Sequence, residues 1–177
     1  MTPLELIGCL REAGSVERCH TIQHHGSYSV GRHSWDAAAL LLVLHPSPSV
    51  ALVRAVLWHD VAERWTGDVP AIAKWDEPKL VQLLVQLEER VFDRLGLAGL
   101  LSSLSEEDAV WLDAVDKLEL WLWANEQLRM GNRNAETVLS NLRSWFHRNE
   151  ARLPLAVLRV HAEYKGETTI DGLLRAT

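Results

Sequence analysis

Apolar side chains recur every three or four residues along most of the chain, which is the spacing of helices that bury one face. The clearest stripe lies within residues 78–95 and consists of Leu80, Leu83, Leu84, Leu87, Val91 and Leu95. The same period predicts further helices at residues 3–13, 34–45, 50–66, 106–130, 134–152 and 154–165. No segment shows the strict alternation of a half-buried strand. The pattern therefore predicts an all-α fold of six or seven helices that form one domain over residues 1–177.

Capping residues mark where several of these helices begin. Thr2 opens a capping box, and Ser49 and Ser105 stand at the starts of two later helices. Between the first two helices, residues 15–32 are polar and irregular, as expected of a loop that lines a pocket. Residues 166–177 carry too few signals for an element to be assigned.

The central helix carries ionisable side chains in apolar surroundings. His59, Asp60 and Glu63 stand within an otherwise apolar run, and the helix ends at the turn signal Thr66-Gly67-Asp68. On one continuous helix Glu63 lies a turn beyond His59 and shares its face, whereas Asp60 points about 100° away from His59. A carboxylate in such surroundings is costly unless it is paired or bound to a cation. This segment is therefore expected to form one side of a metal site.

Two further metal donors are expected from other helices. His33 opens the second helix, and Asp116 has apolar neighbours in the long helix. With His59 and Asp60 they provide two imidazoles and two carboxylates, a set that suits Zn, Mn, Co or Fe better than Mg. A hydrolytic metal takes three or four protein ligands and leaves a position for water.

An alternative interpretation assigns these side chains no metal. The histidines would then be ordinary, partly buried residues, and Asp60 and Asp116 would pair with Arg64 and Lys117. That interpretation leaves unexplained why so many ionisable groups fall within apolar helices.

The pattern resembles the HD-domain phosphohydrolases, and among them the small 5′-deoxynucleotidase (YfbR-like) branch. The residues that carry the resemblance, within roughly residues 15 to 125, are Arg18, His33, His59-Asp60-x-x-Glu63, Thr66-Gly67-Asp68-Val69-Pro70, Lys74 and Asp116. The resemblance implies that His33, His59, Asp60 and Asp116 together hold one divalent ion.

The resemblance also implies roles for the remaining residues. Glu63 and Asp68 are expected to position water and transfer protons, in an order that the sequence leaves open. Arg18 and Lys74 are expected to meet the phosphates. Without the resemblance, Arg18 would be interpreted as a surface charge, and an exposed charge is also the alternative for Lys74.

Two loop positions bear on the choice of substrate. The YfbR-like branch usually has Trp directly after the arginine, near the sugar, whereas this chain has Cys19. The chain is also similar to the compact phage dATP triphosphohydrolases (DatZ type), in which an aliphatic residue beside the base helps to distinguish adenine from 2-aminoadenine; Ile22 is expected to take that place. The preferred hypothesis is metal-dependent hydrolysis of dATP to deoxyadenosine and triphosphate. The alternatives are a 5′-deoxynucleotidase that acts on monophosphates and a non-catalytic helical regulatory module.

Composition and charge limit the partners. The net charge of −6 argues against a nucleic-acid polymer as partner, although a metal and a few cations still allow a pocket to bind an anionic nucleotide. No apolar run is long enough to span a membrane. The chain has two cysteines and no basic start followed by a long apolar run, so a cytoplasmic location is expected. The apolar helix faces are consistent with a homo-oligomer.

Overall fold

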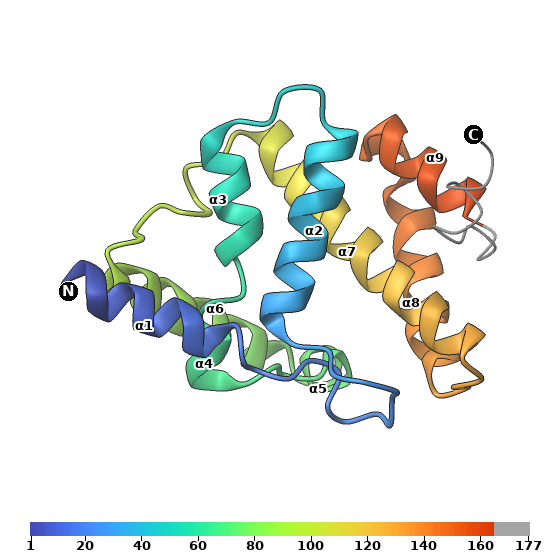
Figure 1. Cartoon of the computed structure of the whole chain (residues 1–177), viewed down its shortest axis with the longest axis horizontal. Helices are drawn as coiled ribbons and strands as arrows, with labels where there is room; N and C mark the ends of the chain where they lie inside the picture. Colours follow the sequence, from blue (N-terminus) through green and yellow to red (C-terminus); the bar gives the residue numbers. More distant parts are fainter. Residues whose placement is uncertain (165–177) are drawn as a thin grey trace, which may run out of the picture.

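Helices make up the regular structure of residues 1–164, the part of the chain that the computed structural model describes (Figure 1). In chain order the elements are α1 (Pro3–Ala13), α2 (Val30–Leu44), α3 (Val50–Trp58), α4 (Glu63–Thr66), α5 (Ala71–Asp76), α6 (Pro78–Leu95), α7 (Glu106–Arg129), α8 (Ala135–Asn149), the 3-10 turn η1 (Glu150–Arg152) and α9 (Leu155–Glu163). The all-α prediction is confirmed. The short helices α4 and α5 raise the number of helices above the expected six or seven. None of the described helices is both long and apolar enough to cross a membrane.

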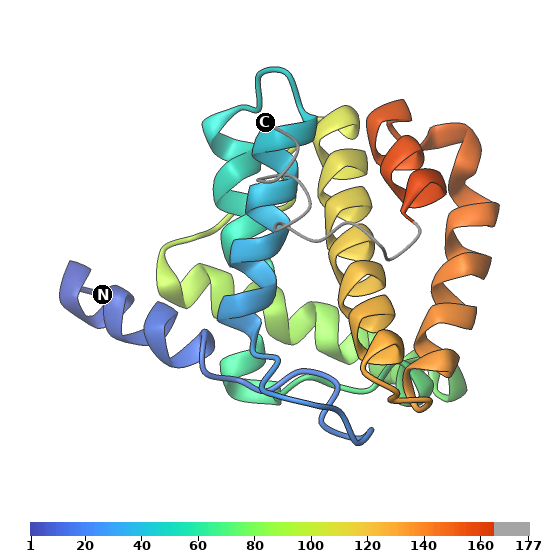
Figure 2. The same ribbon diagram turned by 45° about the vertical axis from the view of Figure 1, so that its right-hand side comes forward.

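The main hydrophobic core surrounds α7, which packs against α2, α3, α8 and α9 (Figure 2). Each of these five helices contributes a fully buried aliphatic side chain: Leu41, Leu52, Leu118, Leu139 and Val157. Burying one such side chain is worth about 1.5–3 kcal/mol, so this cluster accounts for much of the stability of the bundle.

A second, smaller core lies where α1 meets the end of α6. It contains Ala13 of α1, Phe92 of α6, and Val61 and Ala62 from the segment that follows α3. Because α3 belongs to the main core and the segment after it belongs to the second core, the residues between them, His59 and Asp60, lie at the junction of the two.

The start of the second helix differs from the sequence prediction. Helix α2 begins at Val30, because the Ser29 hydroxyl accepts a hydrogen bond from the backbone N–H of Arg32 at 3.3 Å. His33 therefore lies inside the helix rather than in front of it. The start of α2 is held against the end of α1 by a bond from Gly31 N to Gly14 O of 3.0 Å. A Cβ atom at Gly31 would lie 2.9 Å from that oxygen, so this close approach requires glycine.

The C-terminal helices largely follow the prediction. The helix predicted at residues 134–152 is α8 followed by the 3-10 turn η1. Helix α9 ends at Glu163, whereas the predicted end at Lys165, and residues 166–177, lie outside the described residues.

Candidate metal centre

The segment His59–Ala62 is a series of tight turns between α3 and α4. Its backbone bonds span three residues instead of four, as in Val61 N to Trp58 O (3.1 Å) and Glu63 N to Asp60 O (2.9 Å). The prediction of one continuous helix through Glu63 is therefore wrong. The physical reason is that Val61 and Ala62 must turn into the second core. The tighter turn also brings Asp60 Oδ2 to 3.2 Å from His59 Nε2, although neighbouring side chains diverge on a regular helix.

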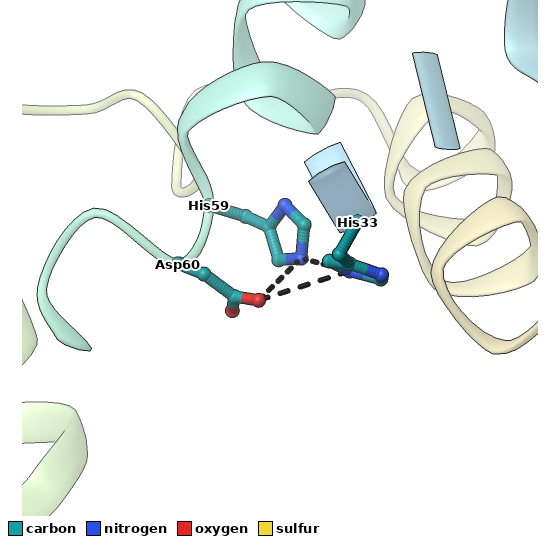
Figure 3. Close-up of side chains that lie close together, drawn as sticks. All are labelled: His33, His59 and Asp60. Carbon is teal, nitrogen blue, oxygen red and sulfur yellow. Dashed lines mark hydrogen bonds and ion pairs between the residues drawn. The ribbon is translucent and has the colours of Figure 1, made fainter. Parts of the chain in front are cut away.

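Three donor atoms converge at this turn (Figure 3). His33 Nε2 lies 3.4 Å from His59 Nε2 and 3.8 Å from Asp60 Oδ2, and all three atoms lie within 4.8 Å of one another. The fourth predicted ligand atom, Asp116 Oδ1 from α7, lies 3.2 Å from His33 Nε2 and 4.0 Å from His59 Nε2. Ligand atoms bound to one tetrahedral ion at about 2.0–2.2 Å stand roughly 3.3–3.6 Å apart. The spacing therefore fits one shared transition-metal ion.

The second nitrogen of each imidazole is also bound. His59 Nδ1 donates to the backbone carbonyl of Val56 at 2.9 Å, and His33 Nδ1 contacts the Glu119 carboxylate. Both Nε2 atoms therefore point into the cluster as the potential metal-binding atoms. Burial alone would lower the pKa of His59, but Asp60 raises it to about 9. A cation that binds here must therefore displace a proton from His59 at neutral pH.

Two cationic side chains flank the carboxylates. Arg18 is buried, contacts Asp60, and places Nη2 3.9 Å from Asp116 Oδ1, so the alternative of a surface charge is wrong. Lys117 pairs with Asp116, as the metal-free alternative expected. The expected pair between Arg64 and Asp60 does not form, because Arg64 contacts Glu12.

Both carboxylates carry negative charge in spite of their burial. Burial alone would raise the pKa of Asp60, but His59 and Arg18 hold it well below its usual range. Burial likewise opposes ionisation of Asp116, and Lys117 lowers the pKa of that group well below its usual range. An ionised carboxylate is the form that binds a cation.

Glu63 and Asp68 have different surroundings. Glu63 Oε2 is buried without a hydrogen-bond partner among the described residues, and burial together with the nearby Asp60 raises the pKa of Glu63 to about 8. Asp68 accepts a hydrogen bond of 2.6 Å from the backbone N–H of Cys19. Cys19 has φ 53°, in the left-handed region that costs a residue with a side chain about 1–2 kcal/mol. The loop therefore accepts backbone strain at the position that binds Asp68.

The remaining predicted residues lie around this cluster. Ile22 and Cys19 pack against the main core, and Lys74 is half-buried on α5, where its charge opposes the rise in the pKa of Glu63. Tyr28 and Glu119, which contact His33, were not predicted from the sequence as part of the site. The available signal was that Glu119 lies three residues after Asp116, on the same face of the long helix.

Comparison with known proteins agrees with this fold. Residues 5–154 match the family model described as 5′-deoxynucleotidase YfbR-like. No curated protein matches the chain. Among solved structures, the cyanophage S-2L HD phosphohydrolase DatZ, bound to dA and one catalytic Zn²⁺ ion, is 22% identical with a TM-score of 0.70, over 89% of this chain and 90% of that chain.

Two other structures show the same architecture. An HD-domain phosphohydrolase from Listeria innocua is 18% identical with a TM-score of 0.70, over 100% of this chain and 91% of that chain. The PH0347 protein from Pyrococcus horikoshii is 23% identical with a TM-score of 0.66, over 88% of this chain and 94% of that chain. These likenesses establish the all-α fold of the HD-domain phosphohydrolases. Since the family model spans most of the sequence, the chain belongs to the YfbR-like 5′-deoxynucleotidase family of hydrolases.

Proposed function

We propose that this chain hydrolyses a deoxynucleotide at its 5′ phosphoester with the help of a divalent ion, and that its substrate is dATP. The observation that carries the proposal is the convergence of His33, His59 and Asp60, with Asp116 3.2 Å from His33. We assign these four side chains as the ligands of Zn, Co or Mn, because two imidazoles and two carboxylates suit these ions better than Mg.

The bound ion supplies Lewis-acid chemistry, polarising a phosphoryl oxygen and lowering the pKa of water toward about 7. Arg18 and Lys74 offset the charge that develops on the phosphoryl oxygens. Arg18 is well placed for this because its guanidinium already lies beside Asp60. Its planar fork suits two phosphate oxygens at once.

We assign the positioning of water and the proton transfers to Glu63 and Asp68. The buried Glu63 Oε2 has no hydrogen-bond partner among the described residues, so the Glu63 carboxyl is available to orient the attacking water. Asp68 is fixed by the Cys19 N–H and is assigned to protonate the leaving 5′-oxygen.

Two observations support dATP as the substrate. DatZ, which shares the fold, is bound to dA and zinc. Ile22 is partly buried in the same loop as Arg18, where an aliphatic side chain can lie beside a base. The name of the matching family favours a second candidate, a 5′-deoxynucleotidase acting on monophosphates.

Product analysis separates these candidates. Purified protein with Zn, Co or Mn is given deoxy- and ribonucleoside mono- and triphosphates, including 2-aminoadenine nucleotides. Triphosphate release from dATP alone supports the proposal, and phosphate release from several deoxynucleoside monophosphates supports the second candidate. No hydrolysis of any substrate by metal-loaded protein would leave the regulatory module as the remaining hypothesis.

We also propose that the chain forms a homo-oligomer. Large apolar side chains are exposed on α5 and α6, namely Ile72, Trp75, Val81, Leu83 and Val85. Covering these side chains with a second copy of the chain would remove their apolar area from water. Light scattering during gel filtration tests this, and a monomeric mass at micromolar concentration would contradict it.

A further inference from the structure

A buried hydrogen-bonded trio lies behind the metal centre. Tyr28 and His33 are 0% exposed and Glu119 is 4% exposed. Glu119 Oε2 accepts a hydrogen bond from Tyr28 Oη at 2.5 Å and contacts His33 Nδ1, while Tyr28 Oη lies 3.3 Å from that nitrogen. A buried carboxylate is costly even when it is paired, and an apolar side chain would often stabilise a core at least as well. Packing alone therefore does not explain why these three polar side chains are buried together.

We propose that Glu119, fixed by Tyr28, is a positioning residue that prepares His33 to bind the metal. This inference rests on the metal centre of the proposed function. Glu119 accepts the Nδ1–H of His33, so the lone pair of Nε2 is directed toward His59 and Asp116, at 3.4 and 3.2 Å. The negative charge of Glu119 also makes the imidazole a stronger donor to a cation.

The long helix supplies three side chains around His33 from one face. Asp116, Glu119 and Trp123 follow one another at intervals of three and four residues on α7, so the three side chains point the same way. Trp123 stacks on the Tyr28 ring with centroids 4.3 Å apart and an interplanar angle of 13°, which fixes the ring that carries the hydroxyl. The hydroxyl on this fixed ring donates its hydrogen bond to Glu119 Oε2.

The other histidine is held in a different way. His59 Nδ1 donates to a neutral backbone carbonyl, that of Val56. No side-chain substitution removes that acceptor, whereas the acceptor of His33 is a side chain. The two imidazole ligands are therefore expected to respond differently to mutation, because only the Nδ1 atom of His33 is held by a charged side chain, Glu119 of α7.

Zinc affinity provides the test. The dissociation constant is measured by competition with a chromophoric chelator for the wild type and for Glu119→Gln, Tyr28→Phe and Glu126→Gln. We expect the affinity for zinc to fall about 10–100-fold in Glu119→Gln. In Tyr28→Phe it should fall by a smaller factor. Glu126→Gln is the matched control, because it removes the same charge from the same helix at a side chain that is 49% exposed and pairs with Arg32. We expect its affinity to equal that of the wild type.

A second readout separates positioning from a merely structural role. In the wild type, the ¹⁵N shifts of His33 should report a proton fixed on Nδ1, and a folded Glu119→Gln protein should show a mixture of tautomers. Wild-type zinc affinity in folded Glu119→Gln would overturn the inference and leave the metal centre standing. If Glu119→Gln does not fold, unchanged affinity in Tyr28→Phe overturns it instead. A wild-type protein without zinc affinity would overturn the metal centre itself, and the inference with it.

Discussion

Replacing Asp116 with Asn is expected to remove most of the stabilisation that a divalent ion gives this protein. At a metal concentration of 100 times Kd, the folded wild type gains about 2.7 kcal/mol. For a chain of this size that gain corresponds to a rise in Tm of about 5–11 °C.

The magnitude for the variant follows from the geometry of the site. Asp116 Oδ1 lies 3.2 Å from His33 Nε2 and its side chain is only 15% exposed, so water cannot readily take its place. Mutating a residue that only hydrogen-bonds to a metal ligand lowers metal affinity by up to about 100-fold. Losing the charged ligand itself should lower the affinity by at least that factor. At the same metal concentration the gain then falls to about 0.4 kcal/mol, or about 1 °C.

Thermal melts in chelator and in excess zinc or cobalt measure this difference. Each variant is compared with its own metal-free melt, because Asp116→Asn also leaves Lys117 without its partner. Asp113→Asn is the control: Asp113 lies one turn earlier on α7, is exposed, and pairs with Arg152 at 2.9 Å. The Asp113→Asn variant should retain the full metal-induced rise in Tm. A full shift in Asp116→Asn, or none in the wild type, would refute the reasoning.

Three further predictions concern a proton carrier, a loop and a half-buried histidine. Glu63→Gln should lower kcat by about 10²–10⁴-fold and leave the metal-induced rise in Tm unchanged. Steady-state kinetics and thermal melts with and without metal measure the two effects. Loss of the metal-induced rise in Tm would indicate that Glu63 is a metal ligand instead. Gln127→Ala removes two hydrogen bonds, of 2.8 and 2.9 Å, to the backbone of His25. In urea it should lower the free energy of unfolding by about 1–3 kcal/mol, whereas the exposed Gln82→Ala should change it by less than about 0.5 kcal/mol. Burial and Arg143 lower the pKa of His161 in the folded protein. The unfolded chain therefore binds a proton at this side chain more tightly than the folded protein does. The free energy of unfolding is consequently unaffected by His161 above the unfolded pKa of about 6.5, and it falls as the pH drops toward the lower folded pKa. Urea midpoints between pH 8 and 5 should therefore fall less in His161→Phe than in the wild type, and equal falls would contradict the assignment.

The helical class and several helix starts were predictable from the sequence because they depend on neighbouring residues. Thr2 and Glu5 form the expected capping box. The Ser49 and Ser105 hydroxyls each accept a bond of 3.0 Å from the backbone N–H three residues later. Such bonds need nothing from the rest of the chain, which is why composition and spacing alone indicate them.

The set of donors was also visible in the sequence, since ionisable residues in apolar helices are a local signal. Their approach to one another was not. His33, His59 and Asp116 come from three different parts of the chain, and only the packing of α2 and α3 against α7 brings their atoms within 4.0 Å. Their role as ligands stays a prediction until metal binding is measured.

The tertiary structure alone decided the details that set the chemistry. The helix is interrupted at His59–Ala62 because the residues before this segment pack into one hydrophobic core and Val61 and Ala62 pack into another. Helical periodicity in the sequence does not show which core a residue joins. The contact between Glu119 and His33 joins residues 86 positions apart. The sequence by itself therefore determined most of the helices and the kinds of candidate ligand, because both follow from local energetics. The geometry of the site and the polar partners behind it depend on long-range burial, which only the folded chain specifies.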